Sequence, residues 1–376
     1  MKLTKFSLVS TLSLLSASVM ASNGTIMSGY GTKNSMMGGA SIALPLDSIA
    51  AANNPAGMGK VGTRVDFGLR IFHGDADNSF HGNDNEIEDM TMAIPEMGAN
   101  YQFSDDVTIG LSVFGSGMAT DYEKQVVPIP GLSKSSNTLN QITIAPTITK
   151  RFGESFYVGF SPTIMYTSIE TNGVPGKKDT SDSATAYGFR VGALWEATEQ
   201  LSLGMMYTPR TKAGEWGRYK NDIFASSNGR FDAPEQLGVG FAYKVAPGTT
   251  IAADAMRIYW GDVDFLNAKG GSGYEDMTVY RIGISQDITD RLVFRAGYSH
   301  ADKFARSEYA DGLFRGPGIS NKSFALGFSY ALSDGYDLQL GYERQLPEKL
   351  EGSGASTGTR LDVDYNYILF GVSKSF

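Results

Sequence analysis

The chain contains 376 residues, of which 45 are glycine, 19 tyrosine and 21 phenylalanine, and it contains no cysteine. The absence of cysteine excludes disulfide bonds and thiolate metal sites, and the formal net charge of -8 at pH 7 argues against nucleic acid as a partner. Many glycines and aromatic residues with only 13 prolines favour short strands and tight turns over long helices.

Residues 1–21 have the pattern of a secretory signal peptide. Lys2 and Lys5 precede an apolar run that is broken by serines, and Val19-Met20-Ala21 forms a small-residue cleavage site, so we expect cleavage after Ala21. No later segment offers about 20 consecutive apolar residues, so the sequence predicts no transmembrane helix. An exported chain of this kind is either soluble or crosses the outer membrane as a barrel of strands.

Residues 22–61 form a separate segment that is rich in glycine, alanine and serine and shows no sustained alternation. Forty residues are more than a leader to the first strand requires. If the following strands close into a large barrel, whose interior its own side chains do not fill, this segment can occupy the lumen as a plug. A disordered periplasmic tail is the alternative, and the apolar residues in the segment, such as Ile42 and Met58, favour the plug.

The rest of the chain, residues 62–376, repeats one pattern. In the stretch Val65–Phe72 every second residue from Val65 is apolar, whereas Asp66, Gly68 and Arg70 lie between them. Since successive side chains of a strand point to opposite faces, one face is apolar and the other mostly polar. The pattern predicts fourteen strands, at 62–74, 90–103, 106–115, 136–152, 155–171, 183–197, 200–212, 233–245, 248–261, 274–288, 290–301, 320–332, 335–347 and 360–376.

The predicted connections alternate between short turns and long loops, which include 75–89, 116–135 and 213–232. Short turns at one end and long loops at the other are typical of an outer-membrane barrel. The sequence therefore predicts an all-β fold: a 14-stranded antiparallel transmembrane β-barrel whose apolar face meets lipid. A soluble sandwich is the alternative, but it does not require loop lengths to alternate.

The last strand, YNYILFGVSKSF, ends in Phe376 with Ile368, Phe370 and Val372 in phase and Lys374 out of phase. A terminal aromatic residue on an alternating strand resembles the signal that the bacterial outer-membrane assembly machinery recognises. We therefore expect this machinery, through Phe376, and outer-membrane lipid to be partners of the chain.

Three stretches together resemble the FadL/TodX family of outer-membrane transporters of long-chain fatty acids and hydrocarbons. The first, in the N-terminal segment, contains Gly38-Gly39-Ala40, Asp47 and then Asn54-Pro55-Ala56-Gly57. The second is Gly117-Met118-Ala119-Thr120-Asp121-Tyr122, and the third is the run from Arg295 to Tyr298. Each motif alone is weak, but they occur in the expected order on the expected elements.

The resemblance implies uptake of hydrophobic molecules through a plugged barrel, with lateral exit through the wall where the third strand kinks. Gly110, Gly115 and Gly117 are the candidates for that kink, because glycine within a strand often marks a bend or bulge. Fatty acids, alkanes and aromatic hydrocarbons all remain open as substrates. A general diffusion porin and a structural or adhesive barrel are the alternative functions.

Strand phase places Arg190, Arg281 and Arg295 on inward faces, where an arginine can hold a fatty-acid carboxylate through bidentate hydrogen bonds. The alternative is that these charges pair with one another and with the plug. In the plug, Pro55 restrains Asn54 toward an extended geometry, so the motif is either a static corner or a hinge.

The sequence gives no support for an enzyme or a cofactor. The three histidines, His73, His81 and His300, fall in or near predicted outer loops, and no Gly-x-Ser-x-Gly or phosphate-binding motif is present. The acidic loop 75–89 lacks the spacing of a calcium loop. We expect no dedicated metal there, and cation bridging to surface saccharide remains open.

Overall fold

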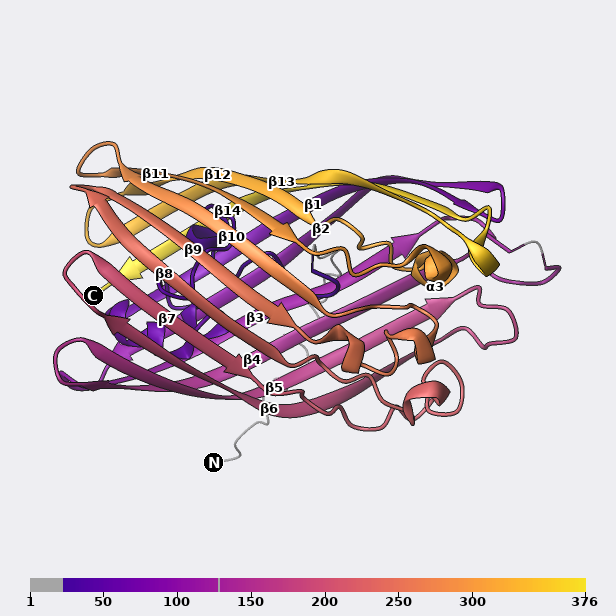
Figure 1. The fold of residues 1–376 in the computed structure, drawn as a ribbon, viewed down its shortest axis with the longest axis horizontal. Helices are drawn as coiled ribbons and strands as arrows, with labels where there is room; N and C mark the ends of the chain where they lie inside the picture. The colour runs from indigo at the N-terminus through magenta and orange to yellow at the C-terminus, as the bar shows by residue number, and fades with distance from the viewer. Residues whose placement is uncertain (1–22, 128) are drawn as a thin grey trace, which may run out of the picture.

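The computed structural model describes residues 23–127 and 129–376, and the predicted signal peptide lies outside them. The chain forms one closed barrel of fourteen antiparallel strands (Figure 1), which confirms the predicted fold. The strands are β1 Arg64–Phe80, β2 Asn83–Gln102, β3 Val107–Asp121, β4 Ser136–Phe152, β5 Phe156–Asn172, β6 Thr180–Glu196, β7 Leu201–Thr208, β8 Gln236–Ala246, β9 Thr249–Ile258, β10 Met277–Asp287, β11 Leu292–Ala301, β12 Lys322–Ala331, β13 Tyr336–Glu351 and β14 Arg360–Ser375.

Short helices occur only before β1 and in the loops of the described chain. They are α2 Thr32–Ser35, η1 Ala50–Ala52, η2 Pro55–Lys60, η3 Ala225–Ser227, η4 Trp260–Asp262, η5 Ala268–Gly270, η6 Ser307–Tyr309, α3 Ala310–Leu313 and η7 Gly354–Ser356. No helix within the described residues is long and apolar enough to cross a membrane.

Each strand pairs with its neighbour along the chain, and β1 closes the barrel by pairing with β14, as at Phe67 and Val372. On most strands the apolar series faces outward and is exposed, whereas the alternate series is mostly buried inside. On β5, Phe156 and Tyr166 are ten residues apart. Ten steps of about 3.3 Å at a tilt of about 40° span about 25 Å, the height of the apolar band of outer-membrane barrels.

The prediction of a long loop at 75–89 is wrong. β1 continues to Phe80 and β2 begins at Asn83, so only His81 and Gly82 form the turn between them. The two strands stay paired to Phe80 and Asn83, with one shift of register between Gly74 and Ala76. The outward-facing residues in this part of the hairpin are polar. It therefore lacks the alternating apolar residues from which the strands were predicted.

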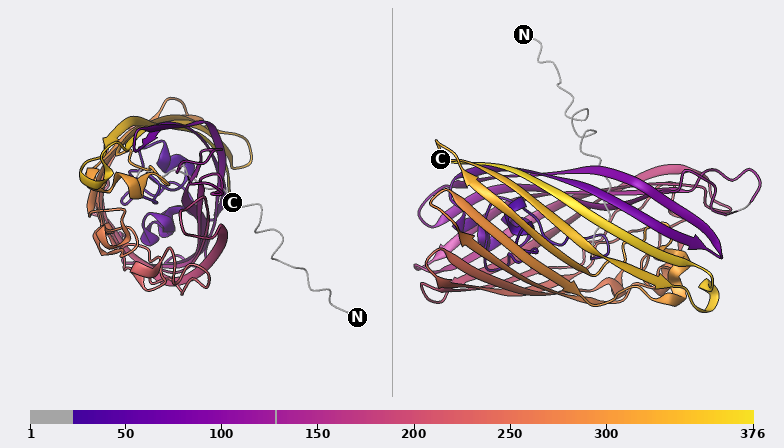
Figure 2. Two further views of the ribbon diagram at one scale, coloured as in Figure 1. Left: turned by 90° about the vertical axis from the view of Figure 1, so that its right-hand side faces the viewer. Right: turned by 90° about the horizontal axis from the view of Figure 1, so that it is seen from above.

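Residues 23–62, called the N-terminal segment below, lie inside the barrel (Figure 2). Wall carboxylates accept its backbone N–H groups: Asp254 accepts from Ser41 at 2.7 Å, and Asp66 accepts from Ser48 at 2.8 Å. Such bonds satisfy donors that would otherwise be buried without partners. The polar face of the first strand therefore contacts the N-terminal segment and not open water.

A ring of inward-facing wall glycines makes room for this segment. A Cβ atom added at any of them would lie within 3.0 Å of an atom of the N-terminal segment, closer than real Cβ contacts allow. The ring has one member on every strand except β4 and β9, and we call it the glycine belt: Gly68, Gly98, Gly110, Gly159, Gly192, Gly204, Gly238, Gly283, Gly297, Gly327, Gly341 and Gly371. Twelve of the 45 glycines therefore serve close packing between wall and segment.

Candidate functional site

The motif Asn54–Gly57 ties the N-terminal segment to the barrel wall. The side-chain amide of Asn54 donates to the backbone oxygens of Ile42, at 2.7 Å, and Ala193, at 3.0 Å. Its Oδ1 accepts the backbone N–H of Ala56 at 3.1 Å and so caps η2. One side chain thus joins two parts of the segment to β6.

Pro55 and Gly57 fit into the same corner. Pro55 occupies the first turn of η2, where a missing N–H costs nothing, and its carbonyl accepts a hydrogen bond from Thr149 on β4 at 2.9 Å. A Cβ added at Gly57 would lie 2.7 Å from Cβ of Pro45. These contacts are what a static corner requires, and the hinge stays a hypothesis.

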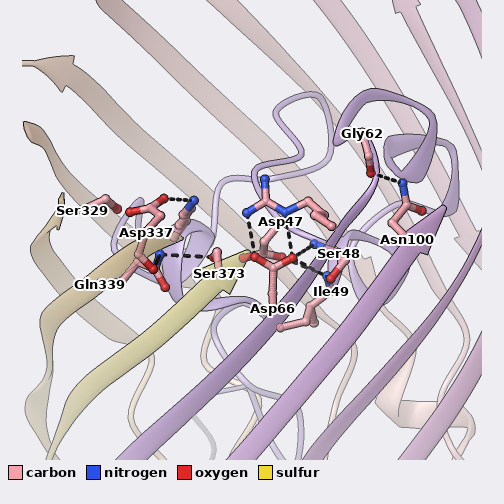
Figure 3. Close-up of polar contacts among 12 residues, drawn as sticks. Asp47, Ser48, Ile49, Gly62, Asp66, Asn100, Ser329, Asp337, Gln339 and Ser373 are labelled. Atoms are coloured by element: carbon pink, nitrogen blue, oxygen red, sulfur yellow. Dashed lines mark hydrogen bonds and ion pairs between the residues drawn. The ribbon is translucent and has the colours of Figure 1, made fainter. Parts of the chain in front are cut away.

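Figure 3 shows a polar cluster between the segment and the part of the wall formed by β12, β13, β14, β1 and β2. Arg64 donates to both oxygens of Asp66, at 2.8 and 2.6 Å, and the Asp66 carboxylate also accepts from Ser48. Lys33 forms an ion pair with Asp337 on β13. Asp47 accepts the backbone N–H of Ile49 at 3.0 Å.

Asp47 is the acid of this cluster that lies in the N-terminal segment. Burial, together with the negative charges of Asp66 and Glu96, raises the pKa of Asp47 to about 7. This carboxyl therefore retains its proton at pH values where an ordinary aspartate is ionised, so the docking of the segment is expected to depend on pH.

A cavity of about 300 Å³, called the outer cavity, lies among the long loops and the strand ends next to them. Its walls are mostly apolar and come from β3, β4, β5 and the loops after β7, β9 and β11: Met118, Leu139, Ile169, Phe231, Phe265 and Leu313. Lys177, Asp222 and Arg315 are among its polar wall residues. An apolar cavity with a few polar groups is the usual form of a site for a hydrophobic ligand.

A smaller cavity of about 50 Å³, called the inner cavity, shares Thr25 and Phe231 with the outer cavity as wall residues. Arg190 on β6 lines it. The guanidinium donates to the backbone oxygen of Ala52 and lies over the ring of Phe114, 5.4 Å from its centroid. The inner cavity therefore places a buried positive charge next to the apolar space above it.

The charge of Arg190 is not balanced by a carboxylate within the described part of the chain. Asp232 lines the same cavity, but it is paired with Arg210 at 2.9 Å. Two further polar atoms of the lining, Oγ1 of Thr208 and Nε1 of Trp260, are buried and have no partner among the described residues. Buried polar groups without partners are rare in folded proteins, and an anionic ligand group would satisfy them.

The pairing between β2 and β3 begins at the end of the barrel with the short turns and stops before the end with the long loops. It runs from Gln102 and Thr108 to Met97 and Val113, and no further β2–β3 pair exists in the described chain. Beyond this point β2 stays paired with β1 and β3 with β4, up to Asp121. We call the unpaired stretch the seam.

A small cavity of about 10 Å³ opens at the start of the seam, and its walls include Ile94, Pro95, Phe114 and Gly115. Of the predicted kink residues, Gly115 and Gly117 lie along the seam, whereas Gly110 lies below it and belongs to the glycine belt. A Cβ added at Gly117 would lie 2.1 Å from the carbonyl oxygen of Leu139, so only glycine fits this paired position.

Residues 8–373 match the family model described as "Outer membrane protein transport protein (OMPP1/FadL/TodX)". The chain belongs to this family. The family predicted from the three sequence stretches is thereby confirmed, and so is the outer-membrane location. No curated protein matches this FadL/TodX-family chain significantly.

Several solved structures share the fold of this FadL/TodX-family barrel. The Pseudomonas putida toluene transporter TodX has a TM-score of 0.72 at 19% identity, covering 94% of this chain and 100% of that one. A Pseudomonas aeruginosa FadL homologue has a TM-score of 0.70 at 16% identity, with 94% and 100% covered. The Ralstonia pickettii toluene transporter TbuX has a TM-score of 0.65 at 16% identity, with 93% and 99% covered.

The three predicted arginines of this FadL/TodX-family chain lie in different surroundings. Arg190 lines the inner cavity. Arg281 lies opposite Asp254 in the β9–β10 register, and its Cδ would lie 3.2 Å from a Cβ added at Gly39. Arg295 donates to Ser329 on β12 at 2.5 Å. Of the three arginines, only Arg190 both lines a cavity and lacks a counter-charge. It is therefore the best candidate of the three to bind a ligand carboxylate.

Sequence reasoning missed Thr208, Trp260 and Phe231 as cavity residues. Phe231 lies in the loop between β7 and β8, and Trp260 lies just after β9. Phe231 was expected in the long loop 213–232, whereas Thr208 and Trp260 were expected near the ends of the strands at 200–212 and 248–261. Whether an aromatic residue in a loop points into the lumen depends on the backbone conformation of that loop. The alternation of apolar residues does not predict that conformation.

Proposed function

We propose that this FadL/TodX-family protein takes up long-chain fatty acids or related hydrocarbons across the outer membrane. The apolar outer cavity, with the uncompensated Arg190 in the adjoining inner cavity, carries the proposal. Burial of a methylene is worth about 0.8 kcal/mol, so six methylenes in the outer cavity would contribute about 5 kcal/mol. That is enough for capture without a chemical reaction.

A ligand with a carboxylate head fits this arrangement better than a neutral hydrocarbon. A carboxylate that pairs with Arg190 would offset the cost of a buried charge, and Thr208 and Trp260 would supply further donors. A neutral hydrocarbon would leave Thr208 and Trp260 without partners and the charge of Arg190 without a counter-charge. The similarity to the toluene transporter TodX keeps aromatic hydrocarbons as the second candidate.

Binding of fluorescent or radiolabelled oleate to the purified protein in detergent tests the proposal, with hexadecane and toluene as competitors. We expect saturable oleate binding that excess hexadecane displaces weakly. If toluene binds and oleate does not, the second candidate replaces the first. If none of the three binds, the transport proposal fails and a structural barrel becomes the better interpretation.

We further propose that the ligand leaves sideways through the seam and that the N-terminal segment closes the bore below. The small cavity at Pro95 and Gly115 supports the sideways route, and the glycine belt supports a closed bore, because segment and wall approach closely at twelve of the fourteen strands. A general diffusion porin would need an open lumen. In planar bilayers we therefore expect little ion current from the native protein.

A reversible cross-link across the seam tests the exit route. Pro95 and Gly115 would be opposite each other if the β2–β3 register continued, and both line the seam cavity. Since the chain lacks cysteine, Pro95→Cys with Gly115→Cys gives a single disulfide. Oxidation should abolish oleate uptake into cells, and reduction should restore it.

The control pair is Ala99→Cys with Leu111→Cys, which are already paired below the seam. Its oxidation should leave oleate uptake unchanged. Equal uptake by the oxidised and reduced seam pair would reject the sideways exit.

A further inference from the structure

The loop between β11 and β12, which carries α3 at the right-hand end of the barrel in Figure 1, contacts β3, although β3 is a neighbour of neither strand. Residues 310–317 of this loop, which begin with α3, are called the strap. Thr120 of β3 donates from its hydroxyl to the carbonyl of Arg315 at 2.7 Å. Tyr122, just beyond β3, donates to the carbonyl of Phe314 at 2.7 Å. The strap thus touches the upper part of β3, which has no β2 partner.

Ring contact strengthens this junction. The rings of Tyr122 and Phe314 stack with centroids 4.6 Å apart and planes at 13°. The hydroxyl of Tyr122 also accepts a hydrogen bond from Asn78 of β1 at 3.0 Å. The side chain therefore links β1, β3 and the strap across the line where β2 and β3 have parted.

The strap is attached on both sides of the seam. On the β2 side, Asp311 contacts His81, in the turn between β1 and β2, at 2.9 Å. On the far side, Arg315 donates to the carbonyls of Asn172 at 2.9 Å and Gly173 at 2.6 Å, at the end of β5. The seam is therefore bridged at its open end by one continuous piece of chain.

Ladder hydrogen bonds hold paired strands at a fixed spacing, and upper β3 lacks them on its β2 side. Hydroxyl groups on Thr120 and Tyr122 bond to the strap in their place. Leu313 and Gly316 of the strap also line the outer cavity together with Met118 of β3. A ligand in that cavity would touch the strap and upper β3 at once.

We propose that the strap positions upper β3 and so sets the width of the seam, with Thr120 and Tyr122 as the positioning residues. Breaking their two hydrogen bonds weakens the attachment of upper β3 to the strap and leaves the ring stack, while the pairing with β4 keeps β3 in the barrel. The inference rests on the proposed sideways exit for its role in transport, but the positioning of β3 can be measured without any ligand.

Spin labels across the seam test the proposal. Ala93 on β2 and Asp121 on β3 are both exposed, and the cysteine-free chain allows labels at Ala93→Cys and Asp121→Cys alone. In the double variant Thr120→Val with Tyr122→Phe, we expect the distance distribution to broaden and to shift outward by up to one strand spacing, about 5 Å. Labels at Ala99→Cys and Leu111→Cys, which are paired below the seam, should show no change.

Tyr219→Phe is the matched control variant, because it also removes a tyrosine hydroxyl that donates to a backbone carbonyl, that of Thr180 at the start of β6, and this contact does not involve the strap. It should leave the seam distance unchanged. Tyr122→Phe alone keeps the ring stack and provides a milder variant if the double variant assembles poorly, which a gel comparison of boiled and unboiled samples would reveal.

An unchanged distance between labels at Ala93 and Asp121 in both Tyr122→Phe and the double variant would overturn the strap proposal, whatever the uptake of oleate. A shifted distance with normal oleate uptake through an oxidised seam cross-link would instead reject the sideways exit and keep the strap as the element that positions β3. The two failures are therefore distinguishable.

Discussion

Substitution of the glycine belt tests whether the N-terminal segment closes the bore. In Gly159→Ala the new Cβ would lie 2.2 Å from the carbonyl carbon of Pro55, and in Gly297→Ala it would lie 2.0 Å from that of Met37. Optimal carbon contacts are about 3.5–4.0 Å, so the segment must move by about 1.5 Å at each site. The clashing atoms are backbone atoms, which no side-chain rotation relieves.

Overpacking of this kind costs about 1–3 kcal/mol per site, so the double variant is expected to lose about 2–6 kcal/mol of docking free energy. The strand pairings do not involve these Cβ atoms, so the barrel should still assemble and migrate differently boiled and unboiled. We expect the double variant to pass fluctuating ion current in planar bilayers, whereas the native protein passes little.

Gly217→Ala is the matched control, because a Cβ at this loop glycine meets nothing within 4 Å. It should leave the ion current at the native level. If Gly159→Ala with Gly297→Ala also shows native current, close packing against the glycine belt does not seal the bore, and the reasoning is wrong.

Three further variants probe the site. Arg190→Met should weaken oleate binding about tenfold to a hundredfold and leave hexadecane binding unchanged, as measured by fluorescence competition; an equal loss for both ligands would indicate a packing defect. Asn54→Ala loses three hydrogen bonds at about 1 kcal/mol each, so the barrel should assemble but its N-terminal segment should be cut faster by protease, with poorer oleate uptake; unchanged uptake removes the hinge. The pKa of Asp47 is raised from the ordinary aspartate value of 3.8 to about 7. The stability that protonated Asp47 contributes to docking is therefore complete at pH values below 3.8 and is lost as the pH rises to about 7. Protease cleavage of the native segment should therefore increase from pH 5 to pH 8, and Asp47→Asn should reduce that increase; an identical pH dependence in the variant would contradict the role of this carboxyl.

The sequence alone determined the barrel, its strand number and the direction of its faces. The reason is that lipid imposes a strict rule: every backbone group must pair between strands and every outward side chain must be apolar. Because of this rule, apolar residues recur at every second position of each strand, as in Val65–Phe72, and this alternation is visible in the sequence. Where the rule ceases, at the polar end of the β1–β2 hairpin, the prediction of a loop at 75–89 was wrong.

The tertiary structure alone decided which inward groups meet. Arg190, Arg281 and Arg295 have the same strand phase, yet only the first lines a cavity that lacks a counter-charge. The glycine belt and the seam likewise depend on contacts between residues far apart in the chain, such as Gly297 with Met37. Alternation specifies the side of a strand on which a residue lies, but what lies opposite it depends on how the segment and loops pack inside the closed wall.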